Sequence, residues 1–229
     1  MEEQYVSFSS PSFDPNEVGN LTSSAILCTV CIDISPSITD YVDSMNNALE
    51  KLYLSELKNS HRKNDILLKV IKFAHDVRNT TGFMPILSLD DDALHVSPTG
   101  KATALYKAVY TALEETMAYR NDLEAQGIEC RSNILIITDG EDNASDHADL
   151  AKLVASVAKL RSNESWARTF TIKLIGVKDE ANFKSAIKNM GLNPDNVLIS
   201  VSATDKELRQ AIGVVSQSVT SNSNTSITF

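Results

Sequence analysis

Oxygen-bearing side chains follow two apolar runs of the sequence, and their types suit a divalent cation. Residues 25–33 form an apolar run that ends in Asp33, and Ser35 and Ser37 follow at a spacing that lets a tight loop turn three oxygens toward one point. A second apolar run, residues 134–138, is followed directly by Asp139. A carboxylate that closes a buried strand is costly unless its charge is paired or bound to a metal. Both acids are therefore candidate ligands.

These oxygens are expected to meet at one edge of a sheet. In a doubly wound sheet the two runs are neighbouring strands, and ligands bind beyond the carboxyl ends of such strands. Asp33 and Asp139 would repel each other there, and one would be forced toward protonation, unless a cation lay between them. The hydroxyl of Thr103, just before a long helical pattern, could point inward from the helix start. Carboxylates with hydroxyls form a hard oxygen site that suits Mg²⁺, and Mn²⁺ and Ca²⁺ remain alternatives.

The elements that would position these residues alternate regularly along the chain. Strands are expected at residues 25–33, 66–73, 83–89, 134–138, 170–177 and 197–201. Amphipathic spacing predicts helices over residues 41–52, 105–123, 150–160, 183–190 and 204–219. Strands that are apolar throughout and separated by helices are buried on both faces. The predicted fold is α/β and doubly wound: a mostly parallel six-stranded sheet with helices on both faces. The short link at residues 78–82 indicates a hairpin, so one edge strand should be antiparallel.

Composition and charge bound the domain organisation and the class of partner. The 229 residues carry a net charge of -9 and no basic stripe, which argues against nucleic acid. No apolar run approaches the about 18 residues of a membrane span, and no signal peptide is evident. Three cysteines, an odd number, favour a reducing, cytoplasmic location. The expected division is a polar arm at residues 1–23, one domain at 24–219 and a flexible tail at 220–229.

Three motifs in register are similar to the metal-ion-dependent adhesion site of von Willebrand factor type A domains. They are Asp33-x-Ser35-x-Ser37, a Gly-x-x-Thr-Ala-Leu-Tyr segment that contains Thr103, and Asp139 followed by glycine. The resemblance covers roughly residues 24–219 and implies a Rossmann-like fold. It further implies that the two serines and the threonine offer hydroxyl ligands to Mg²⁺, while the two acids balance its charge directly or through water.

The resemblance implies a protein-binding module and not an enzyme. One coordination position of the metal would stay open for an Asp or Glu of a partner protein. Pro36 stands where a small glycine is commoner, and Lys101 and Ala102 stand where a glycine-rich step is usual. Neither departure removes a ligand, although Lys101 could alter access to the metal. The ending at residues 215–221 resembles a bacterial subgroup linked to tellurium resistance, with phosphatase- or kinase-like partners and a role in stress or defence.

Two other functions compete with this interpretation. A metal-dependent phosphoryl-transfer enzyme with an Asp33 nucleophile needs a second acid two residues on, where Ser35 stands. A scaffold with a purely structural metal would bind its partners elsewhere, for example through residues 1–23. Several features also have plain structural explanations. Asp33 and Asp139 could cap strands or helices, Ser35 or Ser37 could cap a helix, and the acidic run at residues 90–92 is expected to be a solvated loop.

Overall fold

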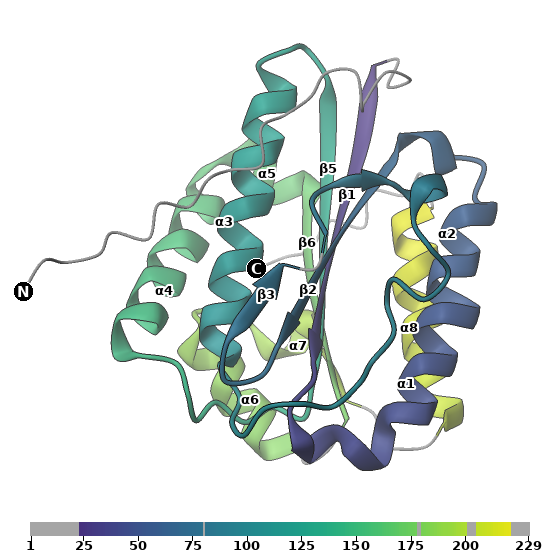
Figure 1. Cartoon of the computed structure of the whole chain (residues 1–229). Helices are drawn as coiled ribbons and strands as arrows, with labels where there is room; N and C mark the ends of the chain where they lie inside the picture. The colour runs from purple at the N-terminus through teal and green to yellow at the C-terminus, as the bar shows by residue number, and fades with distance from the viewer. Residues whose placement is uncertain (1–22, 80, 178–179, 201–204, 221–229) are drawn as a thin grey trace, which may run out of the picture.

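The chain folds into three layers, with a sheet between two layers of helices (Figure 1). The computed structural model describes residues 23–79, 81–177, 180–200 and 205–220. One face of the sheet is covered by α1 (Val42–Ala48), a π-helical segment η2 (Leu49–Leu54), α2 (Ser55–Asn59) and α8 (Asp205–Thr220). The other face is covered by α3 (Leu105–Glu124), α4 (His147–Ser162), α5 (Glu164–Thr169), α6 (Glu180–Asn189) and α7 (Pro194–Val197).

The sheet is mostly parallel, with its antiparallel members at one edge. Its strands are β1 (Ser24–Asp33), β2 (Ile66–Phe73), β3 (Val77–Asn79), β4 (Met84–Pro85), β5 (Glu129–Thr138), β6 (Phe170–Gly176) and β7 (Leu198–Ser200). The order is β3-β2-β1-β5-β6-β7, and β4 also pairs with β2. Among the strands of the described residues, only the pairings of β3 and β4 with β2 are antiparallel. The predicted α/β class and the parallel sheet with an antiparallel edge are confirmed.

The antiparallel edge differs in detail from the prediction. The described residues form seven strands and not six, because the expected hairpin link itself contributes β3. The strand expected at residues 83–89 is reduced to β4, and a short 3-10 turn, η4 (Ile86–Ser88), follows it. Proline has no backbone N–H to donate to a sheet and is tolerated mainly at its edges. Pro85 therefore accounts for the early end of this strand.

Several predicted boundaries concern residues beyond those described. The expected start of the last helix at Thr204 lies outside them, and α8 ends at Thr220. The N-terminal arm, apart from residue 23, and residues 221–229 of the tail also lie outside them, so the division into arm, domain and tail stays a prediction.

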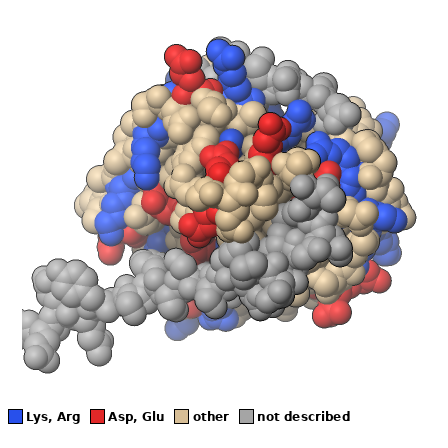
Figure 2. Space-filling view, turned by 90° about the horizontal axis from the view of Figure 1, so that it is seen from above, with Lys and Arg blue, Asp and Glu red and all other residues tan. Residues whose placement is uncertain are grey.

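No helix among the described residues is long and apolar enough to cross a bilayer. Around the amino ends of the strands, the described basic and acidic side chains are interspersed (Figure 2).

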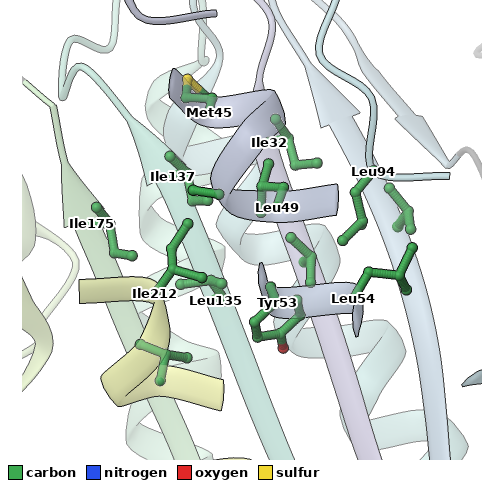
Figure 3. Packing of buried hydrophobic residues seen from close by; sticks show 14 of the residues in the cluster. Ile32, Met45, Leu49, Tyr53, Leu54, Leu94, Leu135, Ile137, Ile175 and Ile212 are labelled. Carbon is green, nitrogen blue, oxygen red and sulfur yellow. The ribbon is translucent and has the colours of Figure 1, made fainter. Parts of the chain in front are cut away.

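The hydrophobic core lies on both sides of β1, which is buried along nearly its whole length. Figure 3 shows one side, where Met45, Leu49 and Tyr53 pack against Ile32 and side chains of β5. All three cysteines are buried and free. The sheet and its two helical layers thus hold the carboxyl ends of the strands in fixed register.

We predict that truncating Leu49, which is fully buried in this cluster, will destabilise the fold strongly. Leu49→Ala should lower the free energy of unfolding by about 2–5 kcal/mol, because it removes buried methyl groups and leaves a cavity. The matched control is Leu87→Ala, whose side chain is 52% exposed and whose loss should change stability by less than about 0.5 kcal/mol. Urea unfolding followed by circular dichroism measures both. Equal losses in the two variants would contradict this description of the core.

Candidate metal site

The two acids singled out in the sequence lie at the carboxyl ends of neighbouring strands. β1 and β5 pair in parallel, with Ile32 opposite Ile137, so that Asp33 and Asp139 follow the last paired positions. Both side chains are buried, Asp33 with 0% and Asp139 with 2% of its surface exposed. The prediction that strand pairing brings them to the same edge is confirmed.

The Asp33 carboxylate is held by hydrogen bonds from both strands. Its Oδ1 accepts the backbone N–H of Ser35 at 2.8 Å, and its Oδ2 accepts the hydroxyl of Thr138 at 2.7 Å. The Thr138 oxygen in turn accepts the backbone N–H of Gly140 at 3.1 Å. These bonds fix the orientation of the carboxylate and connect the turn after β1 to the turn after β5. Thr138 was not singled out in the sequence, because only the strand pairing places its hydroxyl opposite Asp33.

Burial sets the charge state that Asp33 prefers. Its pKa is raised above the usual value, chiefly because burial disfavours the charged form, and the negative charge of Asp139 adds to the rise. The hydrogen bonds from Ser35 and Thr138 stabilise the carboxylate and act in the opposite direction. Repulsion between the two acids therefore contributes to the electrostatics of this edge, as expected from the sequence. A cation beside them would offset both the burial and the repulsion.

The two serines of the first loop lie side by side. Ser35 is buried and Ser37 is exposed, and their Oγ atoms are 2.9 Å apart. Ser35 occupies the N-cap position of a 3-10 helix, η1 (Pro36–Tyr41), but its side chain makes no capping hydrogen bond. Its Oγ instead shares a hydrogen bond with the Oγ of Ser37. Pro36 takes the first position of η1, where a missing N–H costs nothing, which explains how a proline fits in this loop.

Thr103 is joined through its backbone to the loop that follows β5. It is buried directly before Ala104, the N-cap residue of α3. Its N–H donates to the side-chain Oδ1 of Asn143 at 2.7 Å, and its carbonyl accepts the N–H groups of Asn143 at 2.9 Å and of Ala144 at 3.1 Å. The Thr103 segment is therefore bound to the loop that begins at Asp139. Asn143 was not recognised from sequence, since nothing local marks a partner 40 residues away.

The segment that leads to Thr103 is fixed at several points. Asn46 of α1 holds the backbone of Val96, donating to its carbonyl at 3.1 Å and accepting its N–H at 2.6 Å. Further along, the N–H of Thr99 donates to the carbonyl of Ile34 at 2.6 Å. The N–H of Ala104 donates to the carbonyl at position 74 at 2.6 Å. This irregular stretch is thereby anchored to α1, to the turn after β1 and to the end of β2.

Gly140 shapes the turn that follows Asp139. It adopts a positive φ of 90°, and a Cβ there would overlap the ring of Phe183 from α6. A Cβ on Gly176, at the end of β6, would lie 2.8 Å from the other edge of the same ring. The buried Phe183 ring therefore packs directly against the backbone beside Asp139, and both glycines are needed for this close approach.

The other acidic side chains among the described residues do not form a second site. Asp91 makes an ion pair of 2.7 Å with Lys58, and residues 90–92 are exposed, as expected for a solvated loop. Within the described ranges, no group of three or more His, Cys, Asp and Glu side chains could hold a metal. A cation at the strand ends would therefore depend on hydroxyls in addition to two carboxylates.

Comparisons with known proteins show the fold. No protein-family model and no curated protein matches the sequence. Among solved structures, the chain is similar to a von Willebrand factor type A protein from Catenulispora acidiphila (TM-score 0.60, 13% identity, 86% of this chain and 43% of that chain). It is also similar to the pilus adhesin SpaC from Lactobacillus rhamnosus GG (0.63, 10%, 86% and 30%). A third is the vWF domain of the type V pili tip protein Mfa5 from Porphyromonas gingivalis (0.53, 10%, 88% and 98%).

These similarities define the class of fold. The chain has the fold of von Willebrand factor type A domains, and it spans less than half the length of the first two structures. The resemblance inferred from the three motifs thus agrees with the three-dimensional likeness at the level of the fold.

The raised pKa of Asp33 predicts how the cation-free protein responds to pH. Ionised Asp33 costs folding free energy, and this cost disappears as the pH falls through the folded-state pKa toward the usual value. In EDTA at neutral pH, Asp33→Asn should therefore be more stable than the wild type, and the difference should shrink as the pH falls. Urea unfolding of both proteins between pH 7 and 4 measures it. A difference that grows toward acid pH would contradict the prediction.

The contact of Phe183 predicts different costs for two glycine substitutions. Gly127→Ala should cost about 1 kcal/mol, because its φ is 82° but the space around it is open. Gly140→Ala should cost clearly more, since its Cβ also meets the Phe183 ring. Thermal and urea unfolding compare the two variants. If they lose the same stability, the ring does not constrain the turn after Asp139.

Proposed function

We propose that this chain is a protein-interaction module that holds a divalent cation, Mg²⁺, at the carboxyl edge of its sheet. Mn²⁺ and Ca²⁺ are alternatives with the same oxygen preference. The ligands are the residues that the sequence motifs indicate: Asp33, Ser35, Ser37, Thr103 and Asp139. The cation presents an open coordination position to an Asp or Glu of a partner protein.

The observation that supports this proposal most strongly is the burial of two carboxylates on adjacent strand ends. Asp33 and Asp139 are almost fully removed from water, and the negative charge of Asp139 raises the cost of ionising Asp33. Two paired hydroxyls, of Ser35 and Ser37, adjoin them in the same turn. Oxygen ligands without nitrogen or sulfur suit a hard cation such as Mg²⁺. The residues present therefore fit the group that the motifs imply.

The residue types also suit the capture of an acid. Two carboxylates balance a divalent charge, while hydroxyls coordinate without adding charge, so the loaded site does not repel a visiting carboxylate. The bound cation supplies Lewis acidity toward that carboxylate. The chain's own residues orient the ligands: Thr138 and the Ser35 backbone hold Asp33, and the Asn143 loop holds Thr103.

We propose no catalytic role for this site. A phosphoryl-transfer enzyme with Asp33 as nucleophile would need an acid two residues on, and Ser35 stands at that position. Pilus adhesins among the structurally similar proteins are also compatible with a binding function. The alternative of a scaffold with a structural metal differs from the leading proposal in one respect. In the scaffold the partner does not contact the cation, whereas in the leading proposal it does.

The setting we propose is a bacterial stress or defence complex in the cytoplasm. The resemblance of residues 215–221 to a subgroup linked to tellurium resistance supports it, and so do three buried cysteines that remain free thiols. Phosphatase- or kinase-like proteins are the partners this setting suggests. Nucleic acid and membranes are not expected partners, given the net charge of -9.

We predict that Mg²⁺ stabilises the full chain and that this effect requires Asp139. A cation at about 100 times its dissociation constant adds about 2.7 kcal/mol, which corresponds to a rise in Tm of about 5–10 °C for a chain of this size. Asp139→Ala should abolish the rise, whereas Asp122→Ala, an exposed acid near the end of α3, should retain it. Thermal unfolding with and without EDTA measures the effect. An unchanged wild-type Tm in saturating Mg²⁺ would end the proposal.

Partner binding tests the open coordination position. The tagged protein should capture a partner from its native host in Mg²⁺, lose it in EDTA, and lose it equally in Asp139→Ala. Changing the partner's contacting Asp or Glu to Asn or Gln should have the same effect. A partner that stays bound after chelation would point to the scaffold with a structural metal, and the proposed mechanism of capture would be wrong.

A further inference from the structure

The amino end of α3 takes its hydrogen-bond partners from a distant loop. Its N-cap residue, Ala104, has no side chain that could accept a bond. Asp142 accepts the N–H of Tyr106 at 3.2 Å, and Ser145 accepts the N–H of Lys107 at 3.1 Å. Ser145 also donates to the same Asp142 oxygen at 2.6 Å. The loop after β5 thus supplies the caps that the sequence before α3 lacks.

Asn143, in the middle of this loop, acts on Thr103 itself. Its Oδ1 accepts the Thr103 N–H at 2.7 Å, and its own N–H donates to the Thr103 carbonyl at 2.9 Å. Both polar backbone groups of Thr103 are therefore bonded to one residue. The direction of the Thr103 side chain depends on the conformation of this backbone. These two hydrogen bonds with Asn143 therefore set where the Thr103 hydroxyl can point.

The same loop begins at Asp139. Only Gly140 to Asp142 separate this acid from Asn143, and the turn at Gly140 is fixed by the Phe183 ring. One short segment therefore contains one proposed ligand and holds the backbone of another. A shift of this segment would move the Asp139 carboxylate and the Thr103 hydroxyl together.

We propose that Asn143 is a positioning residue for the Thr103 ligand, which rests on the cation site proposed above. Asn143 places the hydroxyl relative to Asp139, and its Oδ1 acceptor is the atom responsible. Because its side chain is exposed, replacing it leaves no cavity in the core. The effect should therefore appear in cation affinity far more than in stability.

The test is a titration of the full chain with Mn²⁺, in which electron paramagnetic resonance measures the concentration of free Mn²⁺. Asn143→Leu removes the acceptor at similar size and should weaken binding by about tenfold or more, the usual effect of losing a residue that orients a ligand. Asn143→Asp keeps the acceptor and should bind within about threefold of the wild type. Titration in about 1 M salt, where the Debye length is about 3 Å, suppresses the long-range effect of the added charge.

Ser145→Ala is the matched control for capping. It removes the bonds to the Lys107 N–H and to Asp142 but leaves the two hydrogen bonds between Asn143 and Thr103. If Mn²⁺ affinity falls only because the end of α3 is weakened, Ser145→Ala should lose as much affinity as Asn143→Leu. Equal losses in the two variants would overturn the inference. An Asn143→Leu variant that binds Mn²⁺ with wild-type affinity would also overturn it. If Asn143→Leu does not fold, Asn143→Ala replaces it in the same comparison.

Failure of the cation site itself gives a different result. If the wild type binds no Mn²⁺, the proposed function falls and this inference with it. If the wild type binds and Asp139→Ala does not, the site stands, and the Asn143 variants then decide the positioning role. Slower amide exchange of Thr103 in Asn143→Asp than in Asn143→Leu would support the assigned hydrogen bond independently.

Discussion

Two carboxylates buried side by side dominate the energetics of one end of this molecule. β1 and β5 pair in parallel, and their register places Asp33 and Asp139 at the same edge of the sheet. Ionising Asp33 costs free energy, because its carboxylate is buried and lies near the negative charge of Asp139. Hydrogen bonds from the Ser35 backbone and the Thr138 hydroxyl recover part of this cost. Such an arrangement is expected to persist in a protein chiefly where the charge serves a function.

The surrounding loops follow from that constraint. A cation site tolerates little displacement of its ligands, so ligands on loops need support from rigid elements. Here the support comes from each side: Asn46 of α1 holds the approach to Thr103, and Asn143 holds Thr103 itself. The Phe183 ring from α6 fills the space beside Gly140. Residues that carry no candidate ligand atom thereby determine the shape of the site.

The sequence predicted the fold class and the position of Asp33 and Asp139 at one edge of the sheet. It did not predict the residues that hold the candidate site in place. Apolar strands separated by amphipathic helices leave little choice but a parallel sheet, and Asp33 and Asp139 stand out because they close such strands. Asn143, Thr138 and Phe183 act across distances in sequence at which a single chain gives no signal. The strand expected at residues 83–89 was too long because hydrophobic content outweighed Pro85, whose missing N–H ends the pairing.

A proton and a divalent cation are alternative solutions to the same electrostatic problem. Protonation of Asp33 removes its charge but leaves an acid group that can no longer bind a metal, whereas a cation keeps both carboxylates ionised and creates an acceptor for a third. The raised pKa of Asp33 therefore makes the proton a competitor of the cation, and cation affinity must fall as Asp33 protonates. In the proposed function, capture of a partner's acid depends on the loaded site, so partner binding would show the same pH dependence. On this proposal, the pH response of binding and the pH response of stability have one origin, the burial of Asp33 beside Asp139.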